Sequence, residues 1–203
     1  LYAEFGGGLA PLTGSGSRRS VMGTTTSAVA AGTAHVFDRS SIIEVQLAST
    51  DFTLASGQTQ KLAQGFNRAL LGEEIVQFAV AEHLGAGNWR LSGLLRGRGG
   101  TEHHAAMIKP VGTAFVLLDD RPVRLAADDL GSSTTVAAIG LVDPDPVVSP
   151  VSGNGNTLQP LTPVHPRAVL QVDGSTILIW TRRARGSWTW NSTVEPPLVV
   201  QTE

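Results

Sequence analysis

The sequence predicts an all-β protein, mainly antiparallel and sandwich-like or barrel-like, with little helix. Short β-branched or aliphatic runs of strand length recur along the chain, and the 23 glycines and 11 prolines fall between them. Glycine and proline at these intervals favour many turns over long helices. The run Ile75–Leu84 also alternates, because Val76, Phe78 and Val80 share one apolar face while the opposite face is mixed.

Six strands are predicted, and the middle ones follow one another as antiparallel neighbours joined by the turns "GEE" and "GAGN". They are Ile42–Leu47, Ile75–Leu84, Trp89–Leu95, Ala114–Leu118, Val136–Leu141 and Ile177–Thr181. One helix candidate lies within Thr59–Leu71, where Leu62 and Phe66 have helical spacing. Gly65 weakens this helix, because glycine lowers helix propensity.

Composition divides the chain into three parts. A β-rich domain is predicted for residues 1–142, a proline-rich linker for 143–160 and a partial fibronectin-III-like module for 161–203. In the third part, the pair Asp173–Gly174 is a strong hairpin signal. A proline-rich strand, this turn and a strand carrying Trp180 are typical of the start of a fibronectin type III sandwich.

Charge and composition exclude several classes of protein. The net charge of −2 argues against a nucleic-acid binder, which normally carries a basic excess on one face. The absence of cysteine excludes disulfides, a thiolate nucleophile and a cysteine-based zinc site. No apolar run is long enough to span a bilayer, and the first residues lack the basic-then-apolar order of a signal peptide.

The segment Arg90–Met107, "RLSGLLRGRGGTEHHAAM", concentrates charge, glycine and histidine. Its glycines match neither a P-loop nor a dinucleotide-binding loop in spacing. They are Gly97, Gly99 and Gly100. We expect them to adopt positive φ in a turn between strands, with no helix following. We also expect Arg96 and Arg98 to pair with acids such as Glu74 or Glu102.

No catalytic, cofactor-binding or metal-binding residue is predicted, and we do not expect an enzyme. His103 and His104, even with Glu102, supply too few ligands for zinc, and adjacent histidines on a strand would point to opposite faces. A glycosidase needs two carboxylates across a cleft, but paired acids are common in turns. The pairs are Glu73–Glu74, Asp119–Asp120 and Asp128–Asp129. No G-x-S-x-G motif of a serine hydrolase is present.

Two tryptophans leave a choice of roles open. Trp188 and Trp190 alternate in "GSWTW" and would share one face of a strand. Such a pair can stack on a sugar ring, but aromatic side chains more often serve packing, and we favour the role of covering the core of a sandwich.

The segments "GEEIVQFAVAEHLGAGNWRLSGLLRGRGGTE", "GTAFVLLDD" and "LQPLTPVHPRAVLQVDGSTILIWTRRARGSW" together resemble the C-terminal region of long tail-tip, or "host specificity", proteins of phages and gene transfer agents. In that family a TIM-barrel-like segment lies upstream of the similar region. The resemblance covers most of the chain from about residue 42 onward, whereas the first forty residues match only loosely. The matching residues are Glu74, Gln77, Phe78, Leu91, Ser92, Gly93, Leu94, Leu95, Arg96, Gly97, Arg98, Gly100, Thr101 and Glu102. Gly99 stands where the family usually has a second arginine.

The resemblance implies a structural part of a virion tail tip or baseplate hub, made in the bacterial cytoplasm and without a cofactor. Expected partners are other tail proteins, further copies of the chain, and a host-envelope glycan or receptor. No nucleic acid is expected among them. The alternative function is a carbohydrate- or receptor-binding module of a host-recognition or cell-wall-acting protein.

Overall fold

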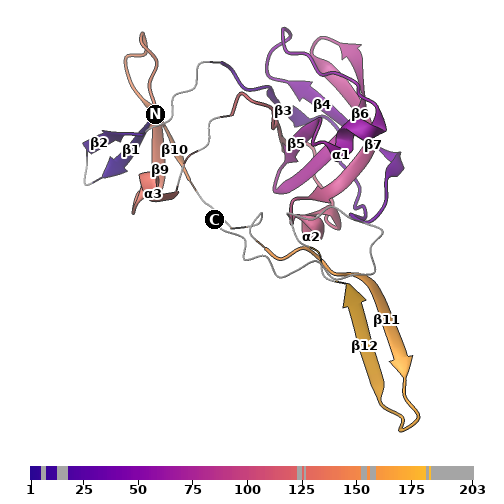
Figure 1. Cartoon of the computed structure of the whole chain (residues 1–203). Coiled ribbons are helices and arrows are strands. Elements are labelled where there is room, and N and C mark those ends of the chain that lie inside the picture. The colour runs from indigo at the N-terminus through magenta and orange to yellow at the C-terminus, as the bar shows by residue number, and fades with distance from the viewer. Residues whose placement is uncertain are drawn as a thin grey trace.

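The computed structural model describes residues 1–5, 8–12, 18–122, 125, 127–151, 155, 159–181 and 183. The chain is 46% strand and 7% helix, and its strands pair antiparallel, which confirms the predicted all-β class. The described strands form a closed six-stranded barrel, a four-stranded sheet and a two-stranded hairpin (Figure 1).

The barrel has the strand order β3-β4-β7-β6-β5-β8, and every neighbouring pair in it is antiparallel. Its strands are β3 (Met22–Thr25), β4 (Asp38–Leu47), β5 (Arg68–Leu71), β6 (Glu74–Gly85), β7 (Asn88–Arg98) and β8 (Ala114–Leu117). The four strands predicted within residues 42–118 are therefore confirmed, although β4 begins earlier and β7 ends later than expected. Closing the sheet removes the exposed edges that an open sheet of these strands would present.

The barrel holds one apolar cluster drawn from the strands β4 to β8 and from the segments that flank the strands. Its members are Val21, Val29, Ile43, Val45, Leu47, Phe52, Leu54, Ala69, Leu71, Val76, Phe78, Trp89, Leu91, Leu94 and Phe115. Burying this many large side chains is the main source of stability for such a fold, at about 1.5–3 kcal/mol each.

Strand β6 is buried on both faces over its first half, which differs from the half-buried strand predicted. Val76 and Phe78 face the barrel core, and Gln77 and Ala79 on the other face are buried as well. The helix α1 (Thr59–Ala63) packs on β6, and the amide of Gln77 donates to the carbonyl oxygen of Leu62, 2.8 Å away. Val80, expected on the apolar face, is half-exposed beyond this cover.

The helix candidate Thr59–Leu71 forms a helix only at its start. Gly65, with φ 89°, and Asn67, with φ 53°, turn the chain out of α1 and into β5. Glycine adopts this left-handed conformation without strain, so the residue that lowers helix propensity here also ends the helix. The other helices in the described part of the chain are single turns, α2 (Glu102–Ala105) and α3 (Ala127–Leu130).

The four-stranded sheet has the order β10-β9-β1-β2 and joins residues from both ends of the predicted first domain. Its strands are β1 (Tyr2–Phe5), β2 (Gly8–Pro11), β9 (Thr135–Ala138) and β10 (Val147–Pro150). Strand β9 stops at Ala138, short of the predicted Leu141. Strand β10 lies within the predicted linker 143–160 and pairs with β9. The three-part domain division stays a prediction, but part of its linker is sheet.

The hairpin of β11 (Val164–Leu170) and β12 (Thr176–Thr181) turns at Asp173–Gly174, as the dipeptide predicted. Gly174 has φ 83°, and its amide donates to the carbonyl oxygen of Gln171. Two strands do not make a sandwich, and the fibronectin-III-like module stays a prediction. Within the described residues, no helix has the length and apolar character needed to cross a membrane.

Candidate functional site

The segment singled out in the sequence forms a β-bulge at the end of β7. Leu95 pairs with Gln77 and Arg98 with Ile75, so three steps along β7 match two along β6. Gly97 sits at this extra step with φ 57°, the conformation of glycine in a common type of bulge. The bulge bends the strand and re-aims the neighbouring side chain of Arg96, which is completely buried.

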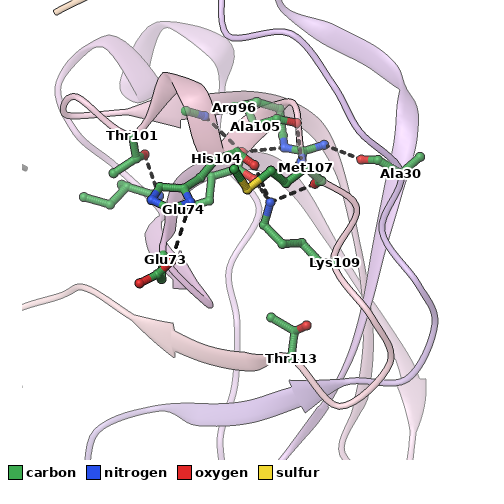
Figure 2. Close-up of polar contacts among 12 residues, drawn as sticks. Ala30, Glu73, Glu74, Arg96, Thr101, His104, Ala105, Met107, Lys109 and Thr113 are labelled. Atoms are coloured by element: carbon green, nitrogen blue, oxygen red, sulfur yellow. Dashed lines mark hydrogen bonds and ion pairs between the residues drawn. The ribbon is translucent and has the colours of Figure 1, made fainter. Parts of the chain in front are cut away.

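Arg96 forms a two-pronged ion pair with Glu74, the first residue of β6 (Figure 2). Its Nε lies 2.7 Å from Glu74 Oε1, and its Nη2 lies 2.9 Å from Glu74 Oε2. The backbone amide of Gly97 donates to the same Oε1 at 3.0 Å. Both side chains have an exposed fraction of 0%, so this carboxylate is held by charged and amide donors in place of water.

A second cation completes the cluster of Glu74, Arg96 and Lys109, which we call the buried ion cluster. Lys109 Nζ lies 3.1 Å from Glu74 Oε2 and also donates to the carbonyl oxygens of His104 and, at 2.9 Å, Met107 (Figure 2). Its side chain is 9% exposed. The backbone of Lys109 exchanges two hydrogen bonds of 2.9 Å with Val29. The cluster therefore ties β6, β7 and the loop before β8 together.

Arg96 also satisfies backbone oxygens that face the interior. Its guanidinium donates to the carbonyl oxygens of Ala30 at 3.2 Å and of Ala105, the last residue of α2, at 3.5 Å. A cation close to the free carbonyls of a helix end is favourable, since these oxygens lack partners within the helix. A four-residue helix has little stability of its own, so α2 depends on these bonds.

The buried ion cluster keeps Glu74 ionised. Burial by itself raises the pKa of this carboxyl, but the hydrogen bonds and positive charge of Arg96, the Gly97 amide and Lys109 outweigh it and leave the pKa below its usual value. A carboxylate with a lowered pKa and occupied oxygens is a poor proton acceptor at neutral pH. The arrangement of Glu74 is that of a structural anchor.

These contacts settle several expectations about the segment. The pairing of Arg96 with Glu74 and the positive φ of Gly97, Gly99 and Gly100 are confirmed. The expectation that the segment simply turns between strands was wrong in part, because β7 continues to Arg98. The turn is confined to Gly99–Gly100. The helix α2 follows directly, although no helix was expected there.

Arg98 lies on the opposite face of the barrel wall from Arg96. Its Nε lies 3.2 Å from Gln77 Oε1, and the side chain is partly buried. The side-chain nitrogen of Gln77 donates two hydrogen bonds, to the carbonyl oxygens of Leu62 and Phe66 at and after α1. Burial, reinforced by the charges of Arg183 and Arg68, lowers the pKa of Arg98, while Glu102 opposes this shift. Arg98 thus links β7 to Gln77 of β6 on the outer face of the barrel.

The two histidines lie in α2 and not on a strand, which corrects the geometry assumed for them. Their ring centroids lie 3.8 Å apart with the ring planes tilted by 43°, and His104 Nδ1 lies 3.7 Å from Glu73 Oε2. Among the residues that the structure describes, no group of three or more histidines and acids is placed to hold a metal ion. The prediction that no metal binds at His103–His104 remains to be tested.

The paired acids separate in the fold. Glu73 is half-exposed and faces His104, whereas Glu74 is buried with Arg96. Asp119 pairs with Arg121 at 3.2 Å, Asp120 pairs with Arg18 at 2.6 Å, and Asp128 and Asp129 lie in the first turn of α3. No pair is thereby brought together as two facing carboxylates in the described part of the chain. Trp188 and Trp190 lie outside the described residues.

Two members of the site were not predicted from the sequence. Lys109 stands alone among apolar residues in "AAMIKPV", which is the one sequence feature that could have indicated a buried lysine. Thr101 is buried, and its hydroxyl accepts the backbone amide of Ile75 at 2.9 Å while donating to the carbonyl oxygen of Arg98 at 2.8 Å. This side chain closes the gap that the bulge opens between β6 and β7.

Replacing Arg96 by Ala should lower the free energy of unfolding by about 3–5 kcal/mol, because Glu74 would remain buried without its main partner. Replacing Arg98 by Ala should cost about 1 kcal/mol, since its bond to Gln77 is partly exposed. Urea unfolding of both variants measures the difference. Equal losses would show that burial of the ion pair does not distinguish the two arginines.

Replacing Gly97 by Val should destabilise the protein more than replacing Gly99 by Val. Both positions have positive φ, but a Cβ at Gly97 would lie 2.7 Å from Glu102 Cα and 2.9 Å from Ala34 Cβ. A Cβ at Gly99 would meet only Ile75 Cδ1, at 3.4 Å. The shared backbone strain is about 1–2 kcal/mol, and only Gly97 adds a clash with backbone. Thermal melts that rank the two variants in the reverse order would contradict this packing.

The stability that Glu74 provides should depend on pH. Its pKa is lower in the folded chain than the usual 4.5, so its contribution is complete above pH 4.5 and is lost as pH falls through the folded pKa. The wild-type protein should therefore exceed the Glu74→Gln variant in unfolding free energy at pH 7, by about 3–5 kcal/mol. This difference should shrink on acidification. Urea unfolding from pH 7 to pH 3 tests it, and a constant difference would argue against an ionised Glu74.

Comparison with known proteins gives a match to a family model. Residues 20–116 match the sequence model of the family described as "Rcc01698-like, C-terminal". No curated protein matches the chain. The matched residues include strands β3 to β7 and nearly all of β8, together with the buried ion cluster. The barrel is thus the part of this chain that is similar to the Rcc01698-like C-terminal family.

Proposed function

We propose that this chain is a structural component of the tail tip or baseplate hub of a phage, prophage or gene transfer agent. The proposal places it in the virion tail after synthesis in the bacterial cytoplasm, with other tail proteins as its partners. It gives the chain no catalytic role. The support is the similarity of the segment Gly72–Glu102 to tail-tip proteins, joined by the match of residues 20–116 to the Rcc01698-like family.

One structural observation carries the proposal: the shared residues pack on both faces of the barrel wall, some toward the core and others, such as Gln77, under α1. Most of them are buried, and the polar ones among these bond to the interior of the fold. The buried members are Glu74, Gln77, Phe78, Leu91, Leu94, Arg96, Gly97, Gly100 and Thr101. Shared residues that are buried and hydrogen-bonded specify one rigid fold, which is the property of a scaffold. A scaffold is what a tail component contributes to an assembly.

A host-recognition module that binds a glycan or receptor remains the alternative. Its sequence basis, Trp188 and Trp190, lies outside the described residues, so the structure adds nothing in its favour. A sugar site would need exposed aromatic side chains rimmed by polar groups.

Immunogold electron microscopy tests the proposal directly. Antibodies raised against this chain should label tailed particles released by the source bacterium at the distal end of the tail. The same purified chain on a glycan array should show no selective binding. Unlabelled particles together with selective glycan binding that is lost in a Trp188→Ala/Trp190→Ala variant would replace the tail-tip role by the alternative.

A further inference from the structure

The loop that joins β9 to β10 carries two apolar side chains that lie almost wholly in solvent. Leu141 and Val142 have exposed fractions of 108% and 93%, and the loop extends beyond the strands of its sheet (Figure 1). Val147, where the chain returns as β10, is 70% exposed. Single exposed apolar residues are common on protein surfaces, but a group of large ones on one hairpin is typical of a contact surface.

Hydrogen bonds hold this loop in one conformation. The amide of Gly140 donates to Asp143 Oδ2 at 2.7 Å, and the amide of Asp143 donates to the carbonyl oxygen of Gly140 at 3.3 Å. Leu141 and Val142 are the central residues of the turn that these bonds close. The prolines of the sequence "DPDP" that follows fix φ and stiffen the chain. A preorganised loop loses little conformational entropy on binding, which favours association.

Every charged side chain in this part of the molecule is acidic. The sheet β10-β9-β1-β2 and the helix α3 lie within residues 1–17 and 125–151, which contain no lysine, arginine or histidine. Their charged residues are Glu4, Asp128, Asp129, Asp143 and Asp145. On the barrel, by contrast, acids and bases alternate, since Arg90 lies 3.0 Å from Glu44 and 3.5 Å from Glu82. The negative charge of the chain is therefore concentrated on the sheet.

The sign of this charge selects the kind of partner. Anionic membranes and nucleic acids attract lysine and arginine, and both would repel the exposed carboxylates of Asp143 and Asp145 beside the apolar pair. A protein surface with an apolar pocket bordered by lysine or arginine complements both features of the loop. The apolar side chains would fill the pocket, and the carboxylates would pair with cations at its rim.

We propose that the segment 140–145, which we call the acidic tip, docks into an apolar pocket with a basic rim on a partner protein. The tip lies outside the residues 20–116 that match the Rcc01698-like family, so the contact is separate from the family's barrel. The inference deepens the proposed function, because it names the surface through which the chain meets another tail protein. It rests on that function only for the class of protein to which the partner belongs.

Fluorescence anisotropy of the full chain with a labelled amphipathic peptide of leucine and lysine tests the chemistry of the contact. This peptide presents an apolar face with a basic border, as the proposed pocket does. The wild-type chain should bind it with a Kd of about 1–100 µM at low salt, and added salt should weaken the binding because it screens the exposed carboxylates. The same peptide with glutamate in place of lysine should not bind.

Two variants separate the apolar and acidic parts of the tip. Leu141→Ser/Val142→Ser and Asp143→Asn/Asp145→Asn should each weaken binding of the leucine–lysine peptide by about tenfold or more. Asparagine keeps an oxygen that can accept the Gly140 amide, so the second variant preserves the turn. All four side chains are exposed, and thermal melts of both variants should lie close to that of the wild type.

The matched control is Leu170→Ser/Val172→Ser at the turn of the β11–β12 hairpin. These side chains have exposed fractions of 74% and 109%, and Asp173 lies beside them in the sequence. The control should bind the peptide like the wild type. A loss equal to that of the tip variants would show that the peptide recognises exposed apolar surface in general, and it would overturn the proposal.

Other occupants of the tip give different results. A wild-type chain that does not bind the leucine–lysine peptide, or binds the glutamate peptide equally well, would contradict the proposal. Binding to phosphatidylserine vesicles that the Leu141→Ser/Val142→Ser variant loses would assign the tip to a membrane. Dimers of the wild type in sedimentation equilibrium that this variant loses would assign it to a second copy. Either assignment would replace the proposed partner.

The contact and the tail-tip role can fail independently. Tails labelled by the antibody, together with a chain that does not bind the peptide, would remove the contact and leave the tail-tip role. Selective peptide binding by a chain that is absent from tailed particles would leave the contact and remove the role.

Discussion

The removal of the Glu74 carboxylate from water is the constraint on which this end of the barrel depends. An unpaired carboxylate buried in a protein costs several kcal/mol, so its partners must be supplied and held in place. Arg96 provides two donors, Gly97 an amide and Lys109 a second positive charge. Each partner comes from a different local feature: the strand β7, its bulge, and the loop before β8. The pairing of one carboxylate therefore fixes how these features meet.

The bulge, the short helix and the loop have a common cause in this cluster. Without the extra residue at Gly97, the regular register of β7 would not aim Arg96 at Glu74 as the bulge does. In this position Arg96 donates to the last residue of α2, and Lys109 donates to a carbonyl oxygen in the loop that follows α2. The inward position of Lys109 thus leaves the apolar side chains of the same loop at the surface.

Local patterns predicted the barrel strands well and the short peripheral elements poorly. Alternation and turn residues within 42–118 are strong signals, because each strand there is followed closely by its antiparallel partner. Strands β1, β2 and β10 have four residues each beside glycine and proline, and β1 gains β9 as a neighbour from more than 130 residues away. Such pairing is not visible in any local window. The helix α2 was missed for a similar reason, since the carbonyl oxygen of its last residue, Ala105, accepts the amide of the distant Gly32 at 2.7 Å.

The sequence by itself determined the all-β class, the central antiparallel strands, the Asp173–Gly174 hairpin and the pairing of Arg96 with a nearby acid. These follow from periodicity, turn chemistry and the need of a charge for a partner, all of which act over short stretches. Only the tertiary structure decided that Glu74 is the acid, that Lys109 joins it and that β6 is buried on both faces. Whether a residue is buried depends on which segments pack against it from elsewhere in the chain. The sequence around Lys109 is also the same whether the lysine points to water or to a carboxylate. Closure of the barrel settles that choice, because it brings Lys109 against Glu74 and leaves the neighbouring apolar side chains outside.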